Sequence, residues 1–207
     1  KEIGIIGLGS MGTAVALNLT KNYKIFGYDV NKHHNIKSNK NFFFTKNLKE
    51  IFLKTNIFII IVLNENQCEK ILNRFIKIKK NSKFGKIHTI INCTTVSPNW
   101  VKKMHKELKK NNFEYIDCPI SGGPKKAMNG KLSLMLSSKK NIYKKNLALL
   151  KDIGNNIFNL GNKIGTGSTV KIINNCLAGI QIVSAAEAIM LAKKEKINLK
   201  KVFSIIN

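Results

Sequence analysis

The stretch of sequence that decides the fold is Lys1-Glu2-Ile3-Gly4-Ile5-Ile6-Gly7-Leu8-Gly9-Ser10-Met11-Gly12. An apolar strand pattern leads directly into Gly-x-Gly-x-x-Gly, and a helical pattern follows. In this arrangement the first glycine permits a tight turn, the second lets the backbone approach a pyrophosphate, and the third lets the helix pack against the strand. Backbone N–H groups at the helix start then meet the phosphate charge. The sequence therefore predicts a dinucleotide-binding loop made by Gly7, Leu8, Gly9, Ser10, Met11 and Gly12.

A carboxylate in the right place supports this interpretation. A second apolar stretch, residues 23–28, ends at Asp29, about 20 residues past the glycines, where a carboxylate accepts the ribose hydroxyls of the adenosine. A carboxylate here repels a 2′-phosphate and so favours NAD over NADP, although Lys32 nearby weakens the repulsion. We expect NAD as the cofactor, with NADP as the alternative.

The rest of the chain repeats a strand–helix rhythm. Apolar runs bounded by polar helical patterns are typical of a parallel sheet covered by helices. The expected strands are 57–63, 87–91, 113–116 and 132–136, and the expected helices are 66–79, 98–110 and 139–153. The fold class is therefore α/β, with a Rossmann-type dinucleotide-binding domain over residues 1–165. Residues 166–207 are expected to be the start of an all-α domain entered through a long interdomain helix.

That long helix carries an unusual surface. No lysine occurs between Ile172 and Ala192, although lysine makes up about one residue in six of the chain. We expect this surface to be buried at a junction between domains and in a homo-oligomer. A membrane span is disfavoured because Asn174, Asn175 and Glu187 would be costly in hydrocarbon. The chain stops within a helical pattern at residue 207, which predicts a fragment.

The composition raises a different possibility. The net charge of +25 invites a nucleic-acid interpretation, but the 36 basic residues are 35 lysines and Arg74, scattered among 27 asparagines. A nucleic-acid surface favours clustered arginine for its planar bidentate fork. We therefore expect no specific nucleic-acid partner, and keep nucleic-acid binding as the last alternative.

The four cysteines are far apart and form no Cys-x-x-Cys pair, so neither a disulfide framework nor a metal site is expected. They indicate a reducing intracellular compartment such as the cytoplasm or the mitochondrial matrix. His33 and His34 have no nearby third ligand and are expected to be exposed in a polar loop. Phe42-Phe43-Phe44 is expected to be a short buried strand, and Trp100 a packing residue on a helix.

Lys171 stands at the head of the lysine-free helix. Its spacing to Asn174 and Asn175 places the three on roughly one helix face. Partial desolvation would lower the lysine pKa toward neutrality, as a general acid or base requires. The residues alone favour a lysine that extends from a helix start to water.

Four motifs in order resemble the β-hydroxyacid dehydrogenase family, and within it the 3-hydroxyisobutyrate dehydrogenases most closely. The first motif is the glycine loop followed by Asn18-Leu19-Thr20-Lys21, and the second is Asp117-Cys118-Pro119-Ile120-Ser121-Gly122-Gly123, which continues through Ala127, Gly130, Leu132 and Met135. The third is Gly165-Thr166-Gly167 leading to Lys171 and Asn174-Asn175. The fourth is Ala186-Glu187-Ala188. The resemblance covers essentially the whole chain.

The resemblance implies roles for individual residues. Lys171 matches the catalytic lysine, which takes the hydroxyl proton as hydride leaves for the nicotinamide. Asn175 matches a side chain that orients the substrate. The remaining matches are Ser121, Gly122 and Gly123 for the substrate carboxylate, and Leu63, Asn64 and Thr95 for the nicotinamide half of the cofactor. The implied substrate is a small β-hydroxy acid, with 3-hydroxyisobutyrate favoured.

Some positions depart from the family pattern. The family usually has Pro at Asn64, Asp-x-Ser-Thr at residues 92–95, and Gly-Gly at residues 137–138, where this chain has serines. The alternatives are therefore an NADPH-dependent reductase of tartronate semialdehyde, glyoxylate or succinic semialdehyde, or a dinucleotide-binding module without catalysis.

Overall fold

The computed structural model describes residues 1–31, 40–81 and 85–206. Lys32, His33 and His34, considered above, lie outside the described residues. The chain divides into two compact units, Lys1–Lys171 and Ile172–Asn207.

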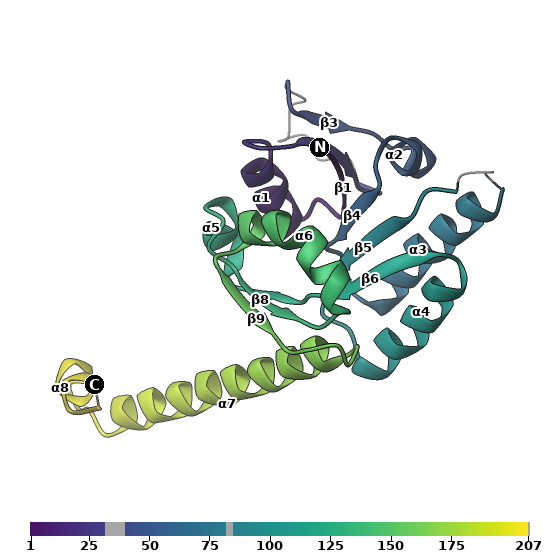
Figure 1. Ribbon diagram of the computed structural model, residues 1–207. Helices are drawn as coiled ribbons and strands as arrows, with labels where there is room; N and C mark the ends of the chain where they lie inside the picture. The colour runs from purple at the N-terminus through teal and green to yellow at the C-terminus, as the bar shows by residue number, and fades with distance from the viewer. Residues whose placement is uncertain (32–39, 82–84, 207) are drawn as a thin grey trace. The chain divides into compact units, whose positions relative to one another are not determined.

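The first unit is built on a six-stranded parallel sheet with the order β3-β2-β1-β4-β5-β6 (Figure 1). Its strands are β1 (Glu2–Ile6), β2 (Lys24–Tyr28), β3 (Phe42–Phe44), β4 (Ile57–Ile60), β5 (His88–Asn92) and β6 (Phe113–Asp117). Neighbouring parallel strands are joined by crossover connections. From β1 the chain adds strands first toward one edge of the sheet, through β2 and β3, and then toward the other edge, from β4 to β6, so the direction reverses between β1 and β4. Ligands of such sheets bind beyond the carboxyl ends of the strands at that point.

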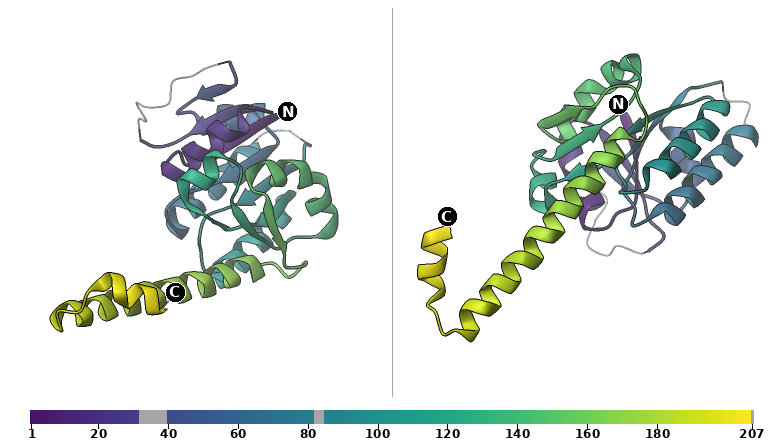
Figure 2. Two further views of the ribbon diagram at one scale, coloured as in Figure 1. Left: turned by 90° about the vertical axis from the view of Figure 1, so that its left-hand side faces the viewer. Right: turned by 90° about the horizontal axis from the view of Figure 1, so that it is seen from below.

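Helices cover both faces of this sheet, and each face has its own apolar core. Core residues of α1 (Ser10–Leu19), α5 (Gly123–Met128) and α6 (Lys140–Ile153) pack on one face. Those of α2 (Leu48–Lys54), α3 (Glu65–Asn81) and α4 (Pro98–Lys110) pack on the other. Figure 2 shows α3 and α4 lying together on one side of the sheet. Every central strand is therefore buried on both faces, which explains its continuous apolar sequence.

A second, three-stranded sheet extends the first unit beyond β6. Its order is β7 (Ile120–Ser121), β8 (Ser133–Leu136) and β9 (Asn156–Asn159), with β7–β8 antiparallel and β8–β9 parallel. It joins the main sheet where Asp117 and Ser137 exchange backbone hydrogen bonds of 3.1 and 2.8 Å. The start of helix α7 (Thr166–Lys194) follows β9 and ends the unit.

Several sequence predictions differ from the structure in detail. Phe42 is buried, but Phe43, on the edge strand β3, is 38% exposed and stacks on the ring of Phe26 with centroids 5.3 Å apart. The long helix begins at Thr166, since Gly165 adopts a positive φ of 95° and separates it from the preceding loop. The α2, β7 and β9 elements were not predicted from the sequence. Trp100 is buried on α4, as expected.

The second unit contains most of α7 and helix α8 (Leu199–Ile206). The lysine-free surface of α7 is not buried within this chain: Ile172, Leu177, Ile180 and Val183 are all exposed. The burial expected from the sequence is therefore not found among the described residues. By length and composition α7 is the one helix among the described residues that meets the criteria for a membrane span, with a mean hydropathy of 1.5. Core helices of proteins meet the same criteria.

Candidate active site

The glycine loop lies where β1 ends and α1 begins. Gly7 has a φ of 93°, and a Cβ atom there would overlap the backbone carbonyl of Ile61. A Cβ atom on Gly12 would overlap the carbonyl oxygen of Gly7, so this close helix–strand contact requires glycine. A Cβ atom on Gly9 would meet nothing within 4 Å. The space above Gly9 is open, as a backbone that approaches a ligand needs.

The end of β2 is tied to this loop. The Leu8 backbone N–H donates to Oδ2 of Asp29 at 2.7 Å, and the Asn31 N–H donates to Oδ1 at 2.9 Å. Gly7 N–H donates to the carbonyl of Tyr28 at 2.8 Å. Fold and hydrogen bonds together bring Asp29 beside the glycine loop, although 21 residues separate Leu8 from Asp29.

Residues predicted to contact the nicotinamide half follow β4 and β5. Leu63, Asn64 and Thr95 are all exposed at the carboxyl edge of the sheet. Asn64 Oδ1 accepts the Gln67 N–H at 3.0 Å, and Gln67 Oε1 accepts the Leu63 N–H at 3.1 Å. These two bonds fix the turn that leads into α3.

Two neighbouring residues that sequence reasoning did not assign hold the turn before Thr95. Asn92 is fully buried at the end of β5, and its Oδ1 accepts the Thr94 N–H at 3.2 Å. Thr94 Oγ1 accepts the Val62 N–H at 3.1 Å and donates to the Ile60 carbonyl at 3.3 Å. The turns after β4 and β5 are therefore linked. The sequence signal was a polar residue at the end of a buried strand, followed two residues later by a threonine.

The segment predicted to hold the substrate carboxylate follows β6 and β7. Gly122 and Gly123 have φ values of 135° and 77°, a conformation that L side chains rarely adopt. Ser121 is half-buried and pairs with Ser133 in the second sheet. The two glycines turn the chain from β7 into α5.

Lys171 lies near the start of α7, at the end of the first unit, and is only 8% exposed. Desolvation by burial lowers the pKa of its ammonium group. Asn175 lies four residues later on the same helix, in the second unit, and is exposed.

A buried carboxylate fixes the start of α7. Asp117, the last residue of β6, is fully buried. Its Oδ1 accepts the Ser168 hydroxyl at 2.7 Å, and its Oδ2 accepts the Ser168 N–H at 3.0 Å and the Ser137 hydroxyl at 3.1 Å. Burial raises the pKa of Asp117, and the two bonds from Ser168 oppose that rise. The sequence placed Asp117 in a motif without assigning it a role.

The residues present fit a bound dinucleotide. In the described part of the chain no side chain caps α1 at Gly9, so the first N–H groups of that helix remain available to a phosphate. The open space above Gly9 admits the pyrophosphate, and Asp29 stands where the ribose is expected. No group of three or more His, Cys, Asp or Glu arranged for a metal occurs among the described residues.

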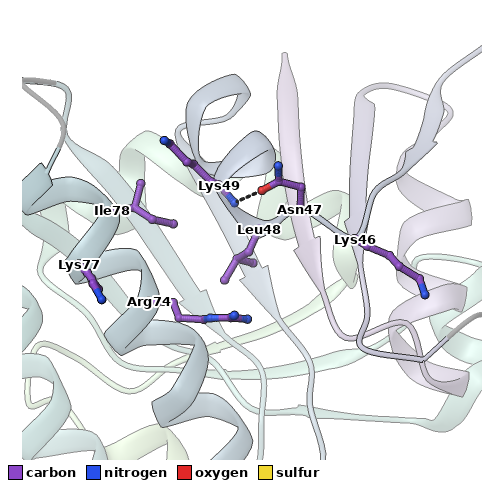
Figure 3. Close-up of a pocket in the computed structure, with 7 residues that line it drawn as sticks. All are labelled: Lys46, Asn47, Leu48, Lys49, Arg74, Lys77 and Ile78. Atoms are coloured by element: carbon purple, nitrogen blue, oxygen red, sulfur yellow. Dashed lines mark hydrogen bonds between the residues drawn. The ribbon is translucent and has the colours of Figure 1, made fainter.

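A separate basic pocket of about 320 Å³ lies between α2 and α3 (Figure 3). Arg74 projects into it and donates from Nη1 to the Tyr28 hydroxyl at 3.5 Å. The lining residues are Lys46, Asn47, Leu48, Lys49, Arg74, Lys77 and Ile78. None of the residues predicted to bind cofactor or substrate lines it.

Two family models match the chain. Residues 2–161 match the NAD binding domain of 6-phosphogluconate dehydrogenase. Residues 165–207 match the model described as the NAD-binding of NADP-dependent 3-hydroxyisobutyrate dehydrogenase.

Curated relatives agree with these matches. The 2-(hydroxymethyl)glutarate dehydrogenase of Eubacterium barkeri is 31% identical over 196 residues, which cover 93% of this chain and 64% of that protein. The L-threonate dehydrogenase of Escherichia coli K12 is 28% identical and is matched over 99% of this chain and 68% of its own length. The mitochondrial 3-hydroxyisobutyrate dehydrogenase of Mus musculus is 29% identical over 99% of this chain and 61% of its length. The chain thus spans 61% to 68% of these three relatives.

Solved structures show the same fold. The crystal structure of 3-hydroxyisobutyrate dehydrogenase from Salmonella typhimurium has a TM-score of 0.81 and 26% identity, over 99% of this chain and 71% of that one. An imine reductase variant from Myxococcus stipitatus in complex with NAD+ has a TM-score of 0.88 over 99% of this chain and 70% of that one, but its 15% identity shows the fold alone. The chain therefore belongs to the β-hydroxyacid dehydrogenase family and carries its NAD(P)-binding domain, of the type found in 6-phosphogluconate dehydrogenase.

Proposed function

We propose that this chain forms the cofactor-binding and catalytic part of an NAD-dependent oxidoreductase that acts on a small β-hydroxy acid. The observation that carries the proposal is Lys171, which is 8% exposed and whose pKa is lowered by desolvation. An amine in such a setting loses its proton more readily than a solvated lysine. It is then able to accept the proton of a substrate hydroxyl.

The chemistry divides between cofactor and chain. The oxidised nicotinamide, when bound, accepts the hydride from the substrate carbon that carries the hydroxyl. Lys171 Nζ takes the hydroxyl proton in the oxidation and returns it in the reverse reaction, acting as general base and general acid. The O–H bond of the hydroxyl and the C–H bond of the carbon that carries it both break, and a carbonyl forms.

The substrate carboxylate is assigned to Ser121, Gly122 and Gly123. A serine hydroxyl and backbone N–H groups are donors suited to an anion. The positive φ values at both glycines support this, since a backbone free of Cβ atoms there leaves room for a ligand. Asn175 is proposed to orient the substrate, because one helical turn separates it from Lys171.

NAD is the proposed cofactor in preference to NADP. Asp29 already meets the glycine loop through the Leu8 N–H, and its charge opposes a 2′-phosphate at the neighbouring ribose. The Gly7–Gly12 loop binds the pyrophosphate, and Leu63, Asn64 and Thr95 contact the nicotinamide half.

The favoured substrate is 3-hydroxyisobutyrate, which gives methylmalonate semialdehyde. The relatives are named for 3-hydroxyisobutyrate, L-threonate and 2-(hydroxymethyl)glutarate, and each of these acids has a hydroxyl on the carbon β to a carboxylate. This shared hydroxyl position supports β-hydroxy acids as the substrate class, and it supports the choice of 3-hydroxyisobutyrate within that class less strongly.

We further propose that the protein is a homo-oligomer in a reducing intracellular compartment. The exposed apolar surface of α7 supports a covering copy of the chain, since water-exposed aliphatic side chains at this density favour association. The four cysteines are free, and three of them are buried.

A substrate panel tests the function. The rate of NADH or NADPH formation is measured for the chain, and for any longer form of the protein, with 3-hydroxyisobutyrate, L-threonate and 2-(hydroxymethyl)glutarate. We expect at least one β-hydroxy acid to turn over, with a higher kcat/KM for NAD than for NADP. Reduced-cofactor binding without turnover of any β-hydroxy acid contradicts the proposal and supports a binding module without catalysis.

A further inference from the structure

The carboxylate of Asp117 is fully buried, yet its hydrogen-bond partners are all neutral. Two bonds come from Ser168 and one from Ser137, with distances of 2.7, 3.0 and 3.1 Å, and the Gly165 backbone N–H is a further donor. Among the described residues no Lys, Arg or His forms an ion pair with it. A buried carboxylate without a cation is costly unless hydrogen-bond donors satisfy it. This side chain is thus a fixed acceptor of hydrogen bonds from its surroundings.

Those donors join three separate segments of the chain. Asp117 ends β6, Ser137 follows β8, and Ser168 lies in the first turn of α7. Ser137 Oγ also accepts the Gly167 N–H at 3.3 Å. The helix start is therefore tied to the ends of two strands from two different sheets.

Close packing reinforces these bonds. A Cβ atom on Gly167 would overlap the carbonyl oxygen of Met135 and approach Asp117 Oδ2 to 3.1 Å. Asp117 and Ser137 also exchange backbone hydrogen bonds of 3.1 and 2.8 Å. The first turn of α7 consequently has little freedom to slide or rotate against the strands.

Lys171 lies three residues after Ser168, one helical turn away, and Ser121 lies four residues after Asp117. One carboxylate thus anchors both the helix that carries the proposed base and the segment that leads to the proposed carboxylate loop. The position of a catalytic group affects the rate strongly, since a misplacement of about 1 Å lowers the rate about 100-fold.

We propose that Asp117 is a positioning residue that holds Lys171 at its place beside the substrate through Ser168 and Ser137. The inference rests on the proposed function, because it presumes that Lys171 is the base. Asp117 itself touches neither substrate nor cofactor in this account. Both oxygens of its carboxylate accept hydrogen bonds, whereas an amide has one oxygen acceptor and a nitrogen that presents hydrogen atoms.

The first test is Asp117→Asn, with Ser168→Ala as a milder variant and Asp152→Asn as the matched control. Asp152 lies on α6, accepts a 2.7 Å hydrogen bond from the Tyr23 hydroxyl, and takes no part in the proposed site. NADH-binding sites are counted by titration, and kcat is expressed per binding site. We expect kcat per site to fall about 100-fold in Asp117→Asn and about 10-fold in Ser168→Ala, with the NADH Kd and the substrate KM changed less than threefold. Asp152→Asn should match the parent.

A merely structural role gives a different result. Loss of folded protein lowers the number of NADH-binding sites but leaves kcat per site unchanged, and that outcome overturns the proposal. If Asp117→Asn does not fold, Ser168→Ala decides, because it removes one hydroxyl and keeps the carboxylate. Unchanged kcat per site in Ser168→Ala then overturns the proposal.

A second readout does not depend on turnover. Reductive methylation with 13C-formaldehyde gives each lysine an NMR signal, and the Lys171 signal is the one absent in Lys171→Arg. In the parent this signal should titrate at lower pH than those of the exposed lysines, and in Asp117→Asn and Ser168→Ala it should move toward them as the side chain gains water. An unchanged titration in both variants contradicts the positioning role. If the parent turns over no hydroxy acid but the Lys171 signal shifts as described, the proposed function fails while the positioning of Lys171 by Asp117 stands.

Discussion

The backbone N–H of Leu8 donates a 2.7 Å hydrogen bond to Oδ2 of Asp29, which joins the glycine loop to the end of β2. The Asn31 N–H donates to Oδ1 of the same carboxylate at 2.9 Å. Asp29 therefore has two tasks under the proposed function: it orients the glycine loop through the Leu8 N–H, and its negative charge is expected at the adenosine ribose.

Asp29→Asn separates these tasks. The amide oxygen still accepts the Leu8 N–H, but the charge that repels a 2′-phosphate is gone. We expect the ratio of the NADPH Kd to the NADH Kd to fall about tenfold, equivalent to about 1.4 kcal/mol. Fluorescence titration of both reduced cofactors measures it, with Asp152→Asn as a charge-matched control. An unchanged ratio contradicts the assignment of cofactor preference to Asp29.

Gly9→Ala and Gly12→Ala should behave differently, because only one added methyl group meets protein atoms. At Gly12 the Cβ atom overlaps the Gly7 carbonyl, so we expect the free energy of unfolding to fall by about 2 kcal/mol or more and NADH binding to be lost. At Gly9 the Cβ atom points into open space, so stability should stay within about 0.5 kcal/mol while NADH binding weakens at least tenfold. Urea unfolding and NADH titration give both quantities. Equal stability losses in the two variants would be evidence against the loop geometry described.

His88 should make stability depend on pH. It is buried against Phe52, with ring centroids 4.2 Å apart, and its Nδ1 has no hydrogen-bond partner within the described ranges. Burial, together with the charge of Lys79, lowers its pKa from 6.5 to about 4. Above pH 6.5 His88 is neutral in both folded and unfolded states. Between pH 6.5 and 4 only the unfolded state takes up the proton, so stability is lost as the pH falls.

The variant that tests this is His88→Phe, because a phenyl ring fills the space of the imidazole and takes up no proton. From pH 7.5 to 4.5 the parent should lose more unfolding free energy than the variant, with a difference of up to about 3 kcal/mol. Urea unfolding at several pH values measures the two slopes. Parallel slopes would show that His88 titrates normally.

The exposed face of α7 should mediate association. Ile180 and Val183 are both 57% exposed and lie one turn apart. We expect the chain to have a solution mass above its 23.3 kDa, and Ile180→Lys to reduce that mass because a charge enters an apolar contact. Light scattering after gel filtration measures it, and Leu53→Lys on α2 is the control for an exposed leucine elsewhere. A monomeric parent contradicts the oligomer.

Much of this architecture follows from local sequence. The glycine loop, Asp29 and the strand–helix rhythm predicted the parallel sheet, because strands buried on both faces have continuous apolar runs between helical patterns. Lys171 was recognised because its helix position and the motif resemblance agreed, and its burial is consistent with the desolvation expected there.

Other features depend on contacts between distant segments. β9 is the four-residue run Asn156-Ile157-Phe158-Asn159, in which two apolar residues lie between two asparagines, and it pairs with β8. Ser168 and Asp117 are 51 residues apart, so their hydrogen bonds have no signal in either neighbourhood. Ser137 appeared in the sequence only as a departure from the family pattern, whereas in the fold its hydroxyl contacts both Asp117 and Gly167.

The central claim is that Lys171 is the acid–base group of a β-hydroxy acid dehydrogenase. The most direct measurement is the rate of NADH formation from NAD+ and the best β-hydroxy acid of the panel, for the parent and for Lys171→Ala. The account predicts that kcat falls by a factor of about 1,000 or more while the NADH Kd changes less than threefold. A Lys171→Ala variant that keeps the parent kcat would contradict it.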